Sequence, residues 1–369
     1  MLERASSARS IPAIAAGVCL SFGAFGAMAA PAAAGTAGTA APAYSNGHAY
    51  RHGAVPFRGQ QHTVAFNQPG RRISHNLRFG GGVSGVGVTT GAEKVYLVFW
   101  GSQWGTQKTN SSGYATFSGD PQAIAPDLQA FFKGLGTGGE TWSGVMTQYC
   151  QGVSTGATSC PSTNTSHVGY PTGGALAGVW EDASSAAPGA ATAHQLAQEA
   201  EKAATHFGNT TTAANRDTQY VIVSPTGTDP DSYETQGFCA WHDYSGDSTL
   251  DGGGAVSGSL VAFTNLPYIP DAGASCGQGF VNSPGTLDGV TIVEGHEYAE
   301  TITDQYPAGG WLDSSGEETG DKCAWISSGQ GKSQNITLTT GSFAVQSTWA
   351  NDFNNGAGGC EVSHAIVPN

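Results

Sequence analysis

The chain contains the stretch Thr291-Ile-Val-Glu-Gly-His-Glu-Tyr-Ala-Glu-Thr-Ile-Thr-Asp304, which predicts one helix around which the rest of the domain is organised. Because residues four apart lie one turn above each other on a helical face, the side chains of His296 and Glu300 point to the same place. Glu297 follows His296 directly, as the glutamate does in the H-E-x-x-H helix of zinc peptidases. The pattern here is H-E-x-x-E, and a carboxylate is as acceptable a zinc ligand as an imidazole. The stretch therefore predicts a zincin-like metal-binding helix.

A third metal ligand is needed from elsewhere, because a catalytic zinc ion takes three protein ligands and one water molecule. Glu318 is the first choice, since it follows Glu300 by 18 positions (300 to 318), a spacing that resembles thermolysin-like zinc peptidases. Asp304, two turns after His296 on the predicted helix, and Asp321 are the alternatives. Asp321 is also suited to orient another ligand.

Glu297 and His242 are the predicted catalytic residues. Glu297 is expected to act as general base toward the metal-bound water, because it occupies the position of the base in H-E-x-x-H helices. His242, within Phe238-Cys-Ala-Trp-His-Asp-Tyr244, is a candidate donor to the oxyanion of the transition state. A histidine hydrogen-bonded near the core is the alternative interpretation of His242.

The identity of the metal is left open by the ligand types. Zinc suits the histidine and the helix pattern, whereas an oxygen-rich set of ligands also attracts calcium. Four acids lie within the nine positions 313 to 321, namely Asp313, Glu317, Glu318 and Asp321. We expect Zn²⁺, with Ca²⁺ as the second candidate and a site without metal as the third alternative.

Composition argues against two classes of partner. The chain has 369 residues, with 14 Lys plus Arg against 28 Asp plus Glu, and a formal net charge of −14. Such an acidic protein is a poor partner for nucleic acid or for an anionic membrane. Only 11% of the residues are charged and 55 are glycine, a balance that is typical of a loop-rich secreted protein rather than of a helical bundle.

Export is predicted by residues 1–29. Arg4 and Arg9 precede an apolar run that ends before Ala27-Met28-Ala29, a small-x-small site for signal peptidase. Residues 30–92 are rich in Ala, Gly and Pro and read either as a disordered linker or as a pro-segment, with Arg71-Arg72 as a natural cleavage point. Residues 93–369 then form a single catalytic-type domain.

Six cysteines remain once Cys19 leaves with the signal peptide. An even number of cysteines in an exported chain predicts three disulfides. Six cysteines allow 15 pairings, of which the sequential one is the simplest: Cys150–Cys160, Cys239–Cys276 and Cys323–Cys360. A cysteine zinc site is the weaker alternative, because the sequence has no C-x-x-C pair.

The pattern of apolar residues predicts an α/β domain with an α+β tendency, built as a layered mixed sheet with flanking helices. Continuous apolar runs, typical of strands buried on both faces, occur at 94–100, 218–224 and 259–264. Helical periodicity covers 126–133 and 190–207. From 335 to 364 apolar and polar residues alternate, which favours antiparallel strands.

Several short blocks carry a resemblance to a known family. They are Val95-Tyr-Leu-Val-Phe-Trp-Gly101, Phe238-Cys-Ala-Trp-His242, Leu287-Asp-Gly-Val290, Thr303-Asp304 and Glu318-Thr-Gly-Asp-Lys-Cys323. Together they resemble the secreted exordium, or phosphate-induced, proteins of plants and their bacterial relatives, over roughly residues 93–364. This resemblance implies an extracellular protein but no particular reaction, so a catalytic role depends on the acidic helix.

These features predict a secreted, zinc-dependent metallohydrolase, an endopeptidase that cleaves extracellular protein or peptide and acts as a monomer. The alternative is a non-catalytic extracellular or cell-wall binding protein with a structural calcium site. Gly152-Val-Ser-Thr-Gly156 matches the nucleophile pattern of esterases, but it lies in a polar loop rather than between a strand and a helix.

Overall fold

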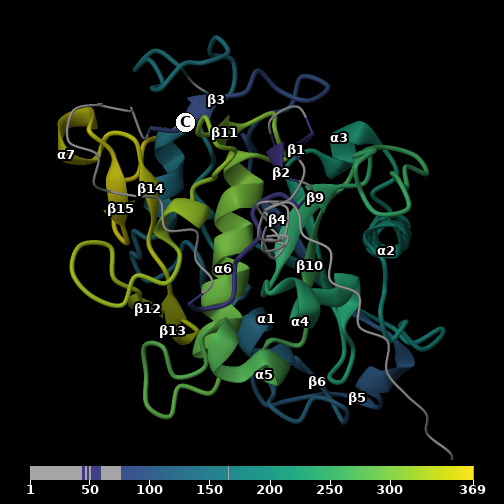
Figure 1. Cartoon of the computed structure of the whole chain (residues 1–369). Coiled ribbons are helices and arrows are strands. Elements are labelled where there is room, and N and C mark those ends of the chain that lie inside the picture. Colours follow the sequence, from purple (N-terminus) through teal and green to yellow (C-terminus); the bar gives the residue numbers. More distant parts are fainter. Residues whose placement is uncertain (1–43, 46–47, 50, 60–75, 165, 369) are drawn as a thin grey trace, which may run out of the picture. The chain divides into compact units, whose positions relative to one another are not determined.

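A five-stranded mixed sheet lies at the centre of the fold (Figure 1). The computed structural model describes residues 44–45, 48–49, 51–59, 76–164 and 166–368. The order across the sheet is β7-β4-β8-β10-β9, with β4 at Lys94–Trp100, β7 at Leu176–Asp182, β8 at Thr218–Val223, β9 at Trp241–Tyr244 and β10 at Ala262–Leu266. The first four in this order are parallel, and β9 pairs antiparallel with β10 at the edge. The predicted α/β class with a mixed sheet is confirmed.

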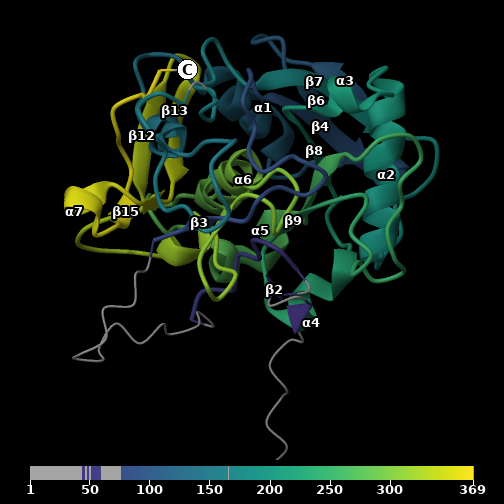
Figure 2. The same ribbon diagram turned by 90° about the horizontal axis from the view of Figure 1, so that it is seen from above.

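Helices cover both faces of the sheet (Figure 2). On one face, α2 (Ala193–His206) packs its alanine-rich side and Leu196 against Ile222 and Phe263. On the other face, α1 (Ile124–Gly134) and α6 (Asp288–Thr303) pack against the sheet. Strands buried on both sides explain the continuous apolar runs from which β4 and β8 were predicted.

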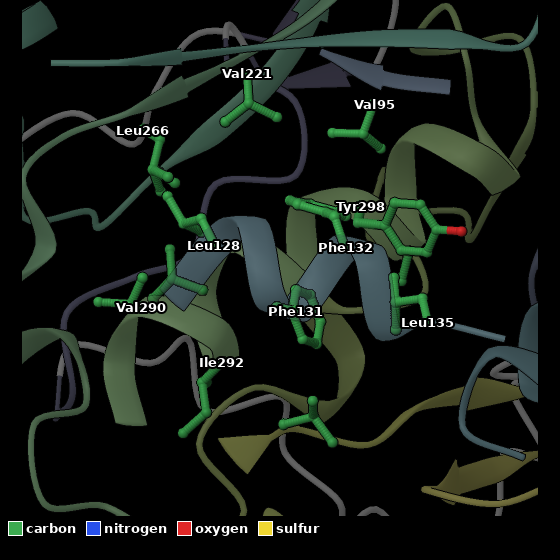
Figure 3. Packing of buried hydrophobic residues seen from close by; sticks show 14 of the residues in the cluster. Val95, Leu128, Phe131, Phe132, Leu135, Val221, Leu266, Val290, Ile292 and Tyr298 are labelled. Atoms are coloured by element: carbon green, nitrogen blue, oxygen red, sulfur yellow. The ribbon is translucent and has the colours of Figure 1, made fainter. Parts of the chain in front are cut away.

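The α6 side of the sheet holds the larger core. Figure 3 shows Leu128 of α1 between Leu266 of the sheet and Val290 of α6, and Phe132 of α1 beside Tyr298 of α6. All 16 residues of α6 are buried, because the sheet, α1 and the C-terminal strands surround this helix. A helix without a solvent face must satisfy its polar side chains inside the protein. The turns of α6 that carry His296, Glu297 and Glu300 therefore lie inside the core.

Short two-stranded antiparallel sheets surround this centre. Their strands are β1 (Tyr44–Ser45), β2 (His48–Ala49), β3 (Arg78–Phe79), β5 (Gln107–Thr109), β6 (Ala115–Phe117), β11 (Trp311–Leu312), β12 (Gln334–Leu338), β13 (Gly341–Val345), β14 (Thr348–Ala350) and β15 (Gly359–Glu361). The pairs are β1 with β2, β3 with β11, β5 with β6, β12 with β13 and β14 with β15. The last two pairs confirm the antiparallel tail that the alternation in 335–364 predicted.

Single helical turns complete the fold. The α-helical turns are α3 (Thr212–Asn215), α4 (Tyr233–Gln236), α5 (Ile269–Ala272) and α7 (Phe353–Gly356). The 3-10 turns are η1 (Ser102–Trp104), η2 (Ser143–Gln148), η3 (Pro230–Ser232), η4 (Gly273–Cys276) and η5 (Asp321–Cys323). Of these, η5 matters most for the site, because it follows the predicted ligand Glu318.

The packed domain starts earlier than the boundary predicted at residue 93. Leu77, Phe79 and Val88 are buried in the same core as α6, and β3 pairs with β11. Val55 is also buried in that core. The described residues from Tyr44 onward belong to one compact unit. The predicted signal peptide and the Arg71-Arg72 cleavage point lie outside the described residues.

Three disulfides join the pairs predicted from the order of the cysteines. The S–S distances are 2.04 Å for Cys150–Cys160, 2.02 Å for Cys239–Cys276 and 1.96 Å for Cys323–Cys360. Disulfides fit an extracellular protein. Within the described ranges, no helix combines the length and the apolar character needed to cross a membrane.

The sequence separations of the bridged cysteines predict which disulfide contributes more to stability. Replacing Cys323 and Cys360 by serine opens a crosslink between residues 37 positions apart and is expected to lower the free energy of unfolding by about 3–4 kcal/mol. The same change at Cys150 and Cys160, only 10 positions apart, is expected to cost about 1 kcal/mol less. Urea unfolding followed by tryptophan fluorescence measures both, and the reverse order would contradict the prediction.

Candidate metal centre

Two groups of possible metal ligands meet at Glu300. The first consists of His242, Glu300 and Glu318, and the second of His296, Glu300 and Asp321. Within each group the ligand atoms all lie within 4.8 Å of one another. The helix α6 supplies His296 and Glu300 from adjacent turns, as the four-residue spacing predicted, and the edge strand β9 brings His242 to them.

The spacing of the ligand atoms within each group fits a small cation. Glu300 Oε2 lies 3.1 Å from His296 Nε2 and 3.7 Å from His242 Nε2. His242 Nε2 lies 3.2 Å from Glu318 Oε2, and His296 Nε2 lies 3.6 Å from Asp321 Oδ1. Donors that surround zinc tetrahedrally at ~2.0–2.2 Å are separated from each other by roughly 3.3–3.6 Å. Imidazole nitrogens and carboxylate oxygens are among the groups that bind zinc, and these separations are compatible with such a site.

Gln346 fixes the orientation of the His296 ring through a contact with Nδ1. The Gln346 side-chain amide donates to the carbonyl oxygens of Gly320 at 2.8 Å and Ser347 at 3.1 Å. Its oxygen Oε1 therefore faces His296 Nδ1, at 3.2 Å, and can only accept a hydrogen bond. Nδ1 therefore carries a ring proton, and Nε2 faces Glu300. Burial lowers the pKa of His296, but the nearby carboxylates of Glu300 and Asp321 outweigh it and hold that pKa well above its usual value in the metal-free protein. A metal-binding histidine is commonly held in this way.

His242 reaches the cluster because side chains alternate along a strand. Its neighbour Trp241 packs in the core on the α2 face of the sheet, so His242 points to the opposite face, toward α6. Its Nδ1 lies 3.5 Å from Thr301 Oγ1. Burial, with a smaller contribution from the charge of His52, lowers the pKa of His242 well below its usual value. A neutral imidazole beside carboxylates is suited to bind a metal rather than to donate to an oxyanion, the role predicted from the sequence.

The second oxygen of Glu300 holds the loop that carries Glu318 and Asp321. Glu300 Oε1 accepts hydrogen bonds from the backbone N–H groups of Gly320 and Asp321, both at 2.9 Å. The backbone N–H of Glu318 in turn donates to Asp321 Oδ2 at 3.0 Å. A Cβ atom on Gly320 would lie 2.7 Å from Cγ and Nδ1 of His296, so only glycine fits there. The loop thus lies directly against the ring of His296.

Burial makes the carboxyl groups of Glu318 and Asp321 hard to ionise without a cation. His242, His296 and Glu300 are 0% exposed and Glu318 is 1% exposed. Burial raises the pKa of Glu318 well above its usual value, and nearby Asp304 and Glu300 raise it further. For Asp321, burial and the charge of Glu300 outweigh the opposing effect of His296, and its pKa is also raised. A divalent cation would offset the charge that keeps these groups protonated.

Glu297 lies beside the ligands without being one of them. It is 0% exposed, and neither of its carboxylate oxygens has a hydrogen-bond partner among the described residues. Burial raises the pKa of Glu297 well above its usual value, while the charge of His296 lowers it and those of Glu300 and Glu294 raise it. A carboxyl group with an elevated pKa next to a metal site is suited to accept and return a proton.

Other buried atoms of the cluster also lack partners. Neither His296 Nε2 nor Glu300 Oε2 makes a hydrogen bond to any described residue. Buried polar atoms are usually satisfied, so several orphaned atoms facing one point suggest a bound ion. The residues present therefore fit a metal of the zinc type.

Asp304 does not join the cluster, which corrects its prediction as a ligand. It belongs to none of the four groups of possible ligands found among the described residues. Its carboxylate accepts hydrogen bonds from the backbone N–H groups of Ala308, Gly309 and Gly310. The spacing of two turns holds only if the helix continues, but α6 ends at Thr303 and Asp304 has a non-helical backbone, with φ −148° and ψ 72°.

The acids predicted to invite calcium are only partly brought together. Asp313 forms an ion pair with Lys322 at 2.7 Å and accepts backbone hydrogen bonds from Ser315 and Glu317. Asp313 and Glu317 belong to none of the four groups of possible ligands in the described part of the chain, whereas Glu318 and Asp321 each belong to one that contains Glu300. The ion pair neutralises Asp313, which leaves the mixed histidine and carboxylate cluster as the candidate centre.

Two features of the centre were missed at the level of sequence. Gln346 lies 50 positions from His296, and a lone glutamine in a strand-rich tail carries no signal of its role. Gly320 lies between the two acids Glu318 and Asp321, next to Thr319, and a glycine among candidate ligands is a signal for close backbone approach.

Comparison with models of known protein families, with characterised protein sequences and with solved structures found no match to this chain. The assignment of a function therefore depends on the geometry of the cluster.

The buried acids predict how the stability of the metal-free protein changes with pH. The pKa values of Glu297, Glu318 and Asp321 are raised in the folded state, and that of Glu317 is raised to about 8, chiefly by burial. Above the ordinary carboxyl pKa the folded state therefore holds more protons than the unfolded state, and stability falls as pH rises through the folded pKa values. His242, whose pKa is lowered, opposes this only below about pH 6.5.

We expect the metal-free protein to lose about 1–3 kcal/mol of stability between pH 6.5 and 8.5. Chemical denaturation after exhaustive chelation measures the change. Bound zinc is expected to abolish the loss, because the ligands are then already ionised. The variant Glu318→Gln should flatten the slope of the metal-free protein; stability that rises with pH in this range would contradict the argument.

Proposed function

We propose that this protein is a secreted, zinc-dependent metallohydrolase, and specifically an endopeptidase that acts on extracellular protein or peptide. The observation that carries the proposal is the meeting of two imidazole nitrogens at one oxygen of Glu300, with Glu297 unpartnered beside them. A hydrolytic centre needs a base next to the metal ligands, and Glu297 follows the candidate ligand His296 directly on α6.

Each residue has a role in this proposal. Glu300 would hold the ion together with the other members of one group, either His296 and Asp321 or His242 and Glu318, and three protein ligands leave one position for water. Zinc, when bound, lowers the pKa of its water and polarises a carbonyl group. Glu297 would take the proton of the attacking water and pass it to the departing amine nitrogen. Gln346 would hold His296 in the tautomer that this arrangement needs.

The family resemblance is part of the proposal as well. The blocks that resemble the exordium family fall in β4, in β9 with His242, at both ends of α6, and in the loop with Glu318 and Asp321. These are the elements that build the sheet and the cluster. Membership of a bacterial branch of that family with a hydrolytic site is consistent with this placement.

A non-catalytic protein with a structural metal is the second candidate. It is favoured by the closure of the cluster, since the side chains of His242, His296 and Glu300 have no exposed surface. Structural zinc sites are closed by four protein ligands, whereas catalytic sites keep an open position. Calcium would also accept the carboxylates.

The variant Glu297→Gln separates the two candidates. It removes the general base without removing a ligand, so casein cleavage is expected to fall by about 10²–10⁴-fold while the zinc content measured by elemental analysis stays unchanged. The variant His296→Ala is expected to lose the metal and the activity together.

Glu294→Gln is the matched control. Glu294 lies one turn earlier on α6, is 0% exposed and has no hydrogen-bond partner for its carboxylate among the described residues. We expect this variant to keep both zinc and activity. A wild-type protein that binds zinc, cleaves no protein or peptide substrate and loses only thermal stability on chelation would instead establish the structural role.

A further inference from the structure

We propose that the chain inhibits itself, because residues 51–58 lie along the edge strand β9 and cover the candidate metal centre in the place of an extended peptide substrate. This inference rests on the proposed function and adds the mode of substrate binding and its regulation. We call this segment the strap; its sequence is Arg51-His-Gly-Ala-Val-Pro-Phe-Arg58.

The strap is hydrogen-bonded to the edge of the sheet as an added antiparallel strand would be. The backbone N–H of His242 donates to the carbonyl of His52 at 3.2 Å. Val55 exchanges two backbone hydrogen bonds with the β9 side, donating to Ala240 at 3.1 Å and accepting from Cys239 at 2.7 Å. Antiparallel bridges join His52 to His242 and Pro56 to Phe238. An extended peptide that binds an exposed sheet edge uses the same groups.

Gly53 is the part of the strap that closes the centre. A Cβ atom built on Gly53 would lie 2.0 Å from Glu300 Oε2 and 2.5 Å from His242 Cδ2. Gly53 also has φ +57°, a left-handed conformation that favours glycine. Its backbone is therefore in contact with the ligand atoms themselves, where the scissile group of a substrate would have to lie.

Further contacts hold the strap at both ends. Arg51 forms an ion pair with Asp231 at 2.5 Å, and His52 Nε2 lies 3.4 Å from Asp247 Oδ2. At the other end Trp325 Nε1 donates to the carbonyl of Pro56 at 2.6 Å. Between these anchors Val55 is 0% exposed and packs in the core that contains α6.

The arrangement also specifies what the released edge would bind. The ligand is an extended polypeptide, since the free groups of β9 are backbone donors and acceptors at strand spacing. Val55, two positions after the residue nearest Glu300, enters an apolar site. A substrate should accordingly carry an aliphatic side chain at the equivalent position. While the strap is in place, the centre can neither receive such a peptide nor exchange its metal readily.

Loosening the strap in the full-length, zinc-loaded protein tests the inference. The variant Val55→Ala removes two buried methyl groups and is expected to raise both the rate of casein cleavage and the rate of zinc transfer to the chelator pyridylazoresorcinol by about tenfold. Leu77→Ala is the matched control, because Leu77 is also 0% exposed and belongs to the same core and the same N-terminal region. We expect it to lower stability without raising either rate.

A second variant and a synthetic peptide test whether the effect of Val55→Ala comes from the strap rather than from misfolding. Arg51→Ala removes the ion pair with Asp231 and the cation–π contact with Phe238 and should change both rates in the same direction as Val55→Ala, to a smaller extent. A synthetic peptide with the sequence of residues 51–58 should slow both rates in Val55→Ala. The same peptide with aspartate at the position of Val55 should have no effect.

The outcomes separate this inference from the proposed function. Equal rates in wild type, Val55→Ala and Leu77→Ala, with zinc bound, overturn the strap and leave the metal centre intact. Faster zinc transfer in Val55→Ala without cleavage of any protein substrate supports the strap as a cover and overturns the peptidase. A wild-type chain that takes up no zinc overturns both.

Discussion

The divided use of the Glu300 carboxylate is the constraint on which the rest of the site depends. One oxygen accepts two backbone hydrogen bonds from the loop at Gly320 and Asp321, and the other faces two imidazole nitrogens. A buried carboxylate without partners would be strongly destabilising, and each of these contacts reduces that cost. Because Glu300 lies on a helix that is buried on all sides, the loop must come to it. The loop then delivers Glu318 and Asp321 to the same place.

The surroundings of Glu300 follow from this geometry. Gln346 bonds the loop through Gly320 and the helix through His296, so one side chain fixes both parts of the centre. The Cys323–Cys360 bridge anchors the end of the loop to β15. Hydrogen bonds to a carboxylate are stronger than neutral ones, which explains why a loop with little regular structure keeps its position. The contacts of Gln346 and the Cys323–Cys360 bridge therefore hold the loop against the cluster.

Sequence reasoning predicted the parts of this fold whose signals are local. Apolar runs located β4 and β8, the His and Glu spacing located α6, and the order of the cysteines gave all three bridges. The strand β9 was missed because it has only 4 residues, and β7 because it is half-exposed and lacks a continuous apolar run. The arrival of His242 at Glu300 depends on how the edge strand crosses the helix, which is a tertiary property with no local signal.

Asp304 and Asp321 show how far spacing alone can be taken. Both are acids near α6, and the helical period favoured Asp304. The period fails where the helix ends, and Asp304 turns instead to bind the backbone of residues 308–310. Asp321 lies close to His296 because Glu300 accepts hydrogen bonds from the backbone of the loop that contains Asp321. A spacing rule predicts ligands within one helix, whereas ligands from loops depend on which backbone groups the helix itself binds.

Closure of the centre and the identity of its ion are physically connected. Carboxylates of Glu300, Glu318 and Asp321 around two imidazoles in a dry interior repel one another, and the energy of that repulsion rises as water is excluded. Protons can relieve it at low pH, whereas a divalent cation relieves it at neutral pH. By excluding water, the backbone of Gly53 strengthens the attraction between such a cation and its ligands as well as blocking access to it. In the proposed enzyme the segment that prevents premature cleavage would therefore also retain the metal until the edge of β9 is released.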